Sequence, residues 1–148
     1  MPKTNTSYAP RSNKRRIKKY QEIIREGGST TQVNHELYAC DLDGQTLSTI
    51  YMDGAFSGVG AIHHTIVIVP VGTSVGTQAT ADGSVPYTNN NYVLYTGWES
   101  GDGDSTKISK KIKAQRKLRV GDKIYLLSTA TATTNAQYID VTMFIKQP

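Results

Sequence analysis

The chain has 148 residues, with 17 Lys and Arg against 12 Asp and Glu, a formal net charge of +5 and a single cysteine. This length fits one domain, and one cysteine excludes both a disulfide framework and a cysteine-based zinc site. The longest apolar stretch is TIVIVPV at 65–71, and the N-terminus lacks the apolar core of a signal peptide. We therefore expect neither a membrane span nor a secretory leader.

Charge is sorted into three zones along the chain. Residues 1–26 contain eight basic and two acidic residues, 27–106 contain eight acidic and no basic residues, and 107–148 contain nine basic and two acidic residues. Eighty consecutive residues without Lys or Arg are not expected of a random distribution. The pattern favours a protein with two differently charged surfaces.

The first 28 residues read as a basic N-terminal arm. Residues 1–12 are polar, with two prolines and no periodicity, which is typical of disorder. Residues 13–26 carry apolar side chains at helical spacing (Ile17, Tyr20, Ile24), and Gly27-Gly28 would end a helix there. We therefore predict a short helix over 13–26 that forms on binding or docking.

The rest of the chain, 29–148, reads as an all-β domain. Runs with strand composition are separated by turn signals such as Asp43-Gly44 and Gly121-Asp122. The predicted strands are 33–40, 47–52, 62–71, 92–98, 106–115, 123–131 and 138–146. Seven or eight short strands without a helical crossover indicate an antiparallel sandwich or barrel. The polar stretch 72–91 is long for a loop and is expected to have a function or to contact another subunit.

The arm is a candidate site for nucleic acid, because clustered Lys and Arg side chains neutralise phosphates and release counterions. A solvated tail and a nuclear-import signal are the alternatives. The candidate phosphate-contacting residues of the arm are Arg11, Lys14, Arg15, Arg16, Lys18, Lys19 and Arg25.

A second basic zone follows at 106–123 (TKISKKIKAQRKLRVGDK). Read as a strand, it alternates between a basic face and a mainly apolar face. The basic face would carry Lys107, Lys111, Lys113, Lys117 and Arg119. Of these, Lys111, Lys113 and Lys117 are candidate nucleic-acid contacts. Two other interpretations are equally acceptable. The lysines could keep an exposed edge strand from pairing with another chain, or they could pair with acidic loops of a neighbouring subunit.

No catalytic or metal site is expected. His63 and His64 are adjacent in a predicted strand and so point to opposite faces, which makes joint metal binding difficult. The acidic loop 99–104 could hold calcium, but its spacing matches no EF-hand and its Asp-Gly pairs are typical of turns. The chain contains no phosphate-binding P-loop. We expect a protein that is not an enzyme and that needs no cofactor.

The layout resembles the coat proteins of small icosahedral viruses built on a single jelly roll. The resemblance rests on the arm, on KLRVGDKIYLLSTAT beginning at Lys117, and on the final segment YIDVTMFIKQP. Within that group the chain is most similar to coats of small circular single-stranded DNA viruses, and in size to satellite-virus coats. The arm here is shorter than is usual in such coats and mixes Lys with Arg.

The resemblance implies a structural capsid protein that assembles with itself, as sixty copies, into a shell around the viral genome. The arms would point inward onto nucleic acid, with single-stranded DNA favoured over RNA. The protein would be found in the virion, without membrane association, after assembly inside the host cell, where the nucleus is one candidate compartment.

Two other classes remain open at this stage. One is a trimeric jelly-roll recognition module of the tumour-necrosis-factor or C1q type. The other is a non-viral nucleic-acid-binding β-barrel with an OB-like fold. The barrel would need stacking aromatic side chains interleaved with basic ones, whereas Tyr92, Tyr95 and Trp98 fall in the zone without Lys or Arg.

Overall fold

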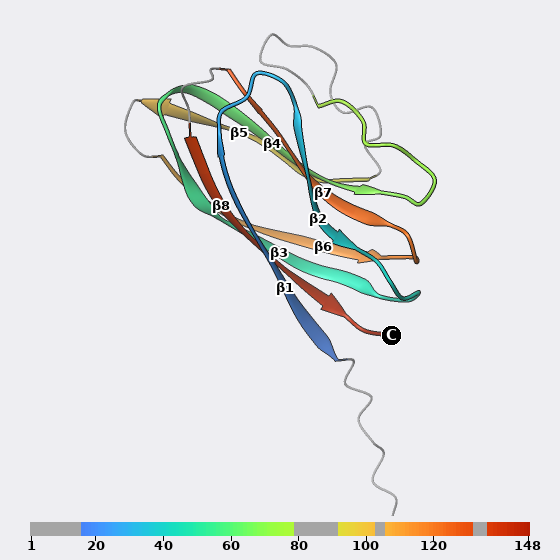
Figure 1. Cartoon of the computed structure of the whole chain (residues 1–148). Helices are drawn as coiled ribbons and strands as arrows, with labels where there is room; N and C mark the ends of the chain where they lie inside the picture. Colours follow the sequence, from blue (N-terminus) through green and yellow to red (C-terminus); the bar gives the residue numbers. More distant parts are fainter. Residues whose placement is uncertain (1–15, 79–91, 103–105, 132–135) are drawn as a thin grey trace, which may run out of the picture.

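The structure, a computed structural model, describes residues 16–78, 92–102, 106–131 and 136–148 (Figure 1). Within these ranges no helix is long and apolar enough to cross a membrane. The described residues form eight strands: β1 (Ile17–Gly27), β2 (Val33–Ala39), β3 (Thr46–Ser57), β4 (Val59–Val69), β5 (Val93–Asp102), β6 (Thr106–Lys117), β7 (Lys123–Ala130) and β8 (Ala136–Lys146).

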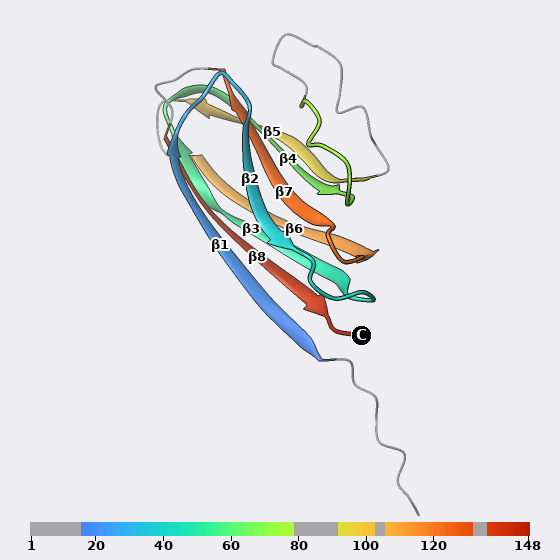
Figure 2. The ribbon, with the colours of Figure 1, turned by 45° about the vertical axis from the view of Figure 1, so that its right-hand side comes forward.

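The strands form a sandwich of two four-stranded antiparallel sheets (Figures 1 and 2). We call the sheet with strand order β1-β8-β3-β6 sheet A, and the sheet with order β2-β7-β4-β5 sheet B. This alternation of the chain between two sheets is the strand order of an eight-stranded jelly roll. The all-β prediction and the jelly-roll prediction are confirmed, and the five-stranded OB barrel is excluded.

All seven strands predicted from the sequence are present, most of them with shifted ends. The helix predicted over 13–26 is wrong, because 17–27 form strand β1, which pairs with β8 along its whole length. Tyr20 and Ile24 are four residues apart, an interval that places two side chains on one side of a helix but also on one face of a strand. Backbone pairing with β8 stabilises the strand, whereas a short helix alone in water would be marginal. β1 is therefore part of the sandwich and not of a separate arm.

The core lies between the sheets and is built from alternate residues of the strands. In β8, every second residue from Gln137 to Ile145 is buried. Ile24 of β1 joins this core, and Tyr20 packs at its margin with its ring 4.7 Å from that of Tyr38. The largest fully buried side chains include Phe56, Leu47, Ile50, Met52, Ile62, Ile66, Ile108 and Ile139.

One polar cluster crosses the core and joins the two sheets. Glu26 and Gln137 belong to sheet A, whereas His35, His64 and Ser128 belong to sheet B. His64 Nε2 donates to Gln137 Oε1 (2.8 Å), and Gln137 Nε2 donates to Ser128 Oγ (3.0 Å) and to Glu26. Glu26 also lies 3.0 Å from His35 Nε2. Burial lowers the pKa of His64, which keeps its imidazole neutral and suited to this arrangement.

The predicted turn at Gly121-Asp122 joins two connections at one end of the sandwich. Gly121 adopts a φ of 92°, which favours glycine. The Asp122 carboxylate accepts from the backbone amides of Val71 (3.1 Å) and Arg119 (2.9 Å). The turn between β6 and β7 is therefore attached to the segment that follows β4.

The incorporation of β1 into the core can be tested with two neighbouring isoleucines. Ile24 is 7% exposed and Ile23 is 49% exposed. We expect Ile24→Ala to lower the free energy of unfolding by about 2–3 kcal/mol, because a buried side chain is removed. Ile23→Ala, the matched control, should change it by less than about 0.5 kcal/mol. Urea denaturation measures both, and equal small effects would contradict the placement of β1.

Candidate nucleic-acid interface

The two sheets divide the charge of the molecule unequally. The strands of sheet A carry ten basic and four acidic residues, whereas those of sheet B carry one basic and three acidic residues. The reason is topological, since β1 and β6 come from the two basic zones and β2, β4 and β5 come from the zone without Lys or Arg. The sorting seen along the chain thus becomes a sorting between sheets.

The outer face of sheet B is covered by the chain itself. Val67 and Leu127 are fully buried there in a small cluster with Val75, which follows β4. Gln78 extends this cover by donating to Thr65 Oγ1 (2.9 Å) and accepting from Thr129 Oγ1 (2.7 Å). The first part of the long stretch predicted at 72–91 therefore packs on sheet B, and residues 79–91 lie outside the described residues.

The outer face of sheet A carries a concentration of positive charge. The register places side chains from all four strands on the side facing away from the core. The basic ones, which we call the basic face, are Lys19, Arg25, Lys107, Lys111, Lys113, Lys117 and Lys146. Six of the seven are exposed, and Lys146 is half-buried. Two carboxylates, Asp53 and Asp140, share this side of the sheet.

Within the described residues, the positive charges of the basic face have no carboxylate partner. Asp140 accepts from Gln21 Nε2 (2.7 Å) and Asp53 accepts from Ser109 Oγ (2.9 Å), so both carboxylates bind neutral donors. Among the described residues, no side chain of the basic face forms an ion pair.

Two lysines elsewhere in the described structure, by contrast, form ion pairs. Lys110, on the other side of β6, binds Glu99 at 3.1 Å, and Lys123 of sheet B binds Glu36 at 2.9 Å. These hydrogen bonds raise the pKa of both lysines, which are half-buried. Among the described residues, the lysines that lack a carboxylate partner are those of the outer face of sheet A and Lys18 on the inner side of β1.

Three half-exposed aromatic side chains lie among these charges. Tyr51 of β3 meets Phe144 of β8 edge-on, with ring centroids 5.8 Å apart. Lys111 Nζ lies 5.6 Å from the centre of the Tyr51 ring, and the guanidinium of Arg25 lies 5.0 Å from that of Tyr138. Cations at such distances are attracted by the negative face of the ring.

The structure brings together only part of the predicted site. Lys19, Arg25, Lys111, Lys113 and Lys117 share the basic face, as the strand alternation predicts for β6. Lys18 pairs with the buried Ile145 and so belongs to the opposite side of β1. Arg16 directly precedes β1, and its backbone carbonyl accepts from the amide of Gln147 (2.7 Å). Arg119 lies beyond β6 in the turn. Arg11, Lys14 and Arg15 lie outside the described residues.

Sequence reasoning missed Lys146 and the three aromatic residues of this face. Alternation within 138–146 could have placed Tyr138, Phe144 and Lys146 on one side of a strand. Their neighbours on β1 and β3, however, depend on strand order, which no local pattern reveals. The aromatic residues weighed for stacking lie elsewhere: the ring of Trp98, in sheet B, stacks on His63 at 4.3 Å.

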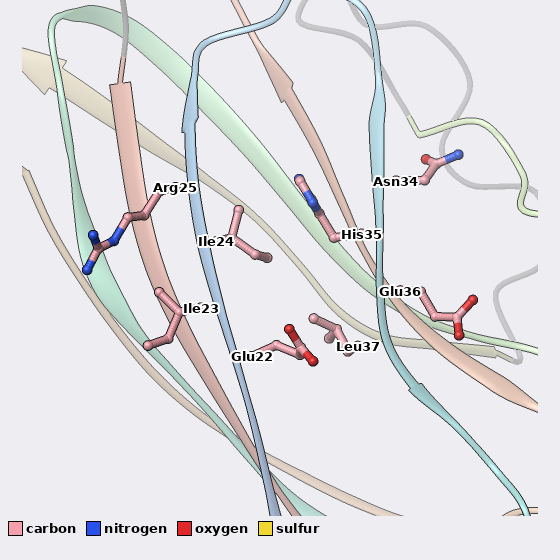
Figure 3. A pocket seen from close by; sticks show the side chains of 8 residues that line it. All are labelled: Glu22, Ile23, Ile24, Arg25, Asn34, His35, Glu36 and Leu37. Carbon is pink, nitrogen blue, oxygen red and sulfur yellow. The ribbon is translucent and has the colours of Figure 1, made fainter.

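A groove of about 380 Å³ lies at the open edge of the sandwich between β1 and β2 (Figure 3). Ile24, Leu37 and His35 point into the gap, whereas Ile23 and Arg25 point away from it. Its lining mixes carboxylates with one imidazole and aliphatic side chains. The groove therefore lacks the concentrated positive charge of the basic face.

The described residues contain no group of three or more His, Cys, Asp or Glu side chains that could hold a metal ion. Asp104, part of the acidic loop considered for calcium, lies outside them.

No protein-family model and no curated protein sequence matches the chain. Among solved structures it is similar to those of the infectious bursal disease virus Gx strain (TM-score 0.33, 9% identity) and Gt strain (0.24, 11%), and to the VP2 subviral particle of the same virus (0.23, 8%). These alignments cover 89%, 90% and 92% of this chain, but only 38%, 42% and 42% of the other. The chain thus spans about two fifths of those proteins. At such scores the fold assignment rests on the strand order of this chain itself.

The contribution of the basic face to nucleic-acid binding can be tested with substitutions on β6. We expect Lys111→Gln with Lys113→Gln to weaken binding of an oligonucleotide, because phosphates lose two cations. The slope of log affinity against log salt should fall by about 0.7 to 0.9 for each lost contact. Lys110→Gln is the matched control, since Lys110 lies on the other side of the same strand and binds Glu99. Fluorescence anisotropy across a salt series measures the slopes, and an equal loss in the control would count against this face.

Proposed function

We propose that the protein is a viral capsid subunit that assembles with itself into a closed shell and holds nucleic acid against the outer face of sheet A. The observation that carries the proposal is the contrast between the two sheets. Sheet B is covered by its own chain and is poor in cations, whereas sheet A presents unpaired cations to its surroundings.

A shell gives a physical reason for this contrast. Each subunit of a closed symmetric assembly has one surface toward the interior and one toward the exterior. Unpaired cations on one face repel one another, and a polyanion enclosed in the shell would relieve that repulsion. The jelly roll is also a fold that capsid proteins use, although lectins share it.

The residues before Ile17, which remain of the predicted N-terminal arm, would add positive charge to the same surface. β1, which begins at Ile17, belongs to sheet A, so the basic residues that precede it are attached to the sheet that carries the basic face. Backbone phosphates would be the main partners of both elements. We extend the proposal to a shell of sixty copies in a virion, with single-stranded DNA as the genome.

Assembly is the decisive test of this function. The full chain should form particles by light scattering and negative-stain microscopy, and nucleic acid should co-purify with them. A stable monomer or a trimer without nucleic acid would overturn the proposal, and a trimer would favour the recognition-module class.

Deletion of residues 1–15 tests the contribution of the first 15 residues alone, because β1 and the rest of the sandwich are kept. We expect the truncated chain to keep its urea midpoint and to package less nucleic acid. Unchanged packaging would show that the arm has no part in it. The truncation must stop before Ile17, since a deletion through residue 26 would remove an edge strand of sheet A.

A further inference from the structure

On the outer face of sheet A, the aromatic side chains lie on the two middle strands and the cations lie mainly on the two edge strands. Tyr51 lies on β3, and Phe144 and Tyr138 lie on β8, the two central strands. β1 and β6 flank them and supply six of the seven cations of the basic face. With strands about 4.8 Å apart, the two basic strands are separated by about 14 Å. An aromatic strip, defined by Tyr51, Phe144 and Tyr138, thus runs between two lines of positive charge.

Phosphate binding alone gives no reason for this strip. Lysines would suffice to neutralise a backbone, and their contacts carry no preference for a nucleic-acid form. The rings on the central strands present π-surface to planar ligands, and Lys111 and Arg25, which lie over the rings of Tyr51 and Tyr138, can reach phosphates. Phe144 and Tyr138 are six residues apart on β8, about 20 Å along the strand, which leaves room for several nucleotides.

We propose that the aromatic strip stacks the bases of a single-stranded polynucleotide while the flanking cations hold its phosphates. This inference rests on the proposed function, because it assumes that nucleic acid lies on sheet A. Bases of a single strand expose their π-faces, whereas bases of a duplex are stacked on one another and closed to the protein. The face should therefore distinguish single-stranded from double-stranded nucleic acid by its rings and not by its charge.

A second copy of the chain is a poorer occupant of this face. Two such faces in contact would bring seven cations against seven, with two carboxylates on each side already bound to neutral donors. Like charges placed together in this way oppose association. A polyanion with planar groups matches both features of the face at once.

The test compares ring variants on two forms of nucleic acid. Binding of the full chain to a 20-nucleotide oligo-dT, to the corresponding oligo-rU and to a 20-base-pair duplex is followed by fluorescence anisotropy. We expect Tyr138→Leu and Tyr51→Leu each to weaken single-strand binding on the order of 5- to 100-fold and to leave duplex binding and the salt slope unchanged. Both single strands should show the effect, because rings contact bases and not sugars.

Tyr92→Leu is the matched control. Tyr92 is 37% exposed against 40% for Tyr138, but it precedes β5 of sheet B. Tyr92→Leu should leave the affinities for single-stranded and for double-stranded oligonucleotides unchanged. Ring variants that bind single strands as tightly as the wild type, or that lose duplex affinity equally, would overturn the stacking proposal and leave the proposed function standing. A wild-type protein that binds neither form would overturn both.

A second measurement guards against unfolded variants, since Tyr51 and Phe144 pack on each other. Photo-crosslinking of the wild-type protein to a 4-thiothymidine oligonucleotide should join the base to β3 or β8. Crosslinks confined to sheet B or to the residues before Ile17 would overturn the inference.

Discussion

The central position of β8 in sheet A is the constraint on which the rest of the structure depends. β8 hydrogen-bonds to β1 on one side and to β3 on the other, and β3 in turn pairs with β6. The C-terminal strand thereby joins the N-terminal basic zone to a sheet that also holds the second basic zone. It also supplies Ile139, Val141 and Met143 to the core from its inner side. Without this pairing β1 would have no place in the sandwich, and the basic face would lose Lys19 and Arg25.

The same arrangement gathers like charges, which costs free energy in the isolated subunit. Two lysines off this face, in contrast, form ion pairs, Lys110 with Glu99 and Lys123 with Glu36. Carboxylates are available on the basic face, yet Asp53 and Asp140 bind Ser109 and Gln21. A sheet that leaves its cations unpaired beside their potential partners is suited to a polyanion from outside the chain. In the proposed shell, the phosphates of the enclosed nucleic acid would neutralise the cations of the basic face.

Much of the fold follows from local sequence patterns. Strand-like runs located seven of the eight strands, and the alternation of 107–113 placed Lys107, Lys111 and Lys113 on one side of β6. β1 was mistaken for a helix because the interval between Tyr20 and Ile24 satisfies both periods, and only the tertiary pairing with β8 decides between them. The site was harder to predict, since Tyr51 meets Lys111 and Phe144 across strands that are distant in the sequence. Strand order carries that information, and composition does not.

Protection of individual lysines tests most directly whether sheet A is the surface that holds nucleic acid. Acetylation of the particle, or of the protein bound to an oligonucleotide, can be compared with that of the free protein by mass spectrometry. The account predicts that Lys111 and Lys113 become protected, while Lys123, half-buried on sheet B, stays as reactive as in the free protein. Protection of Lys123 with continued reactivity of Lys111 and Lys113 would contradict it.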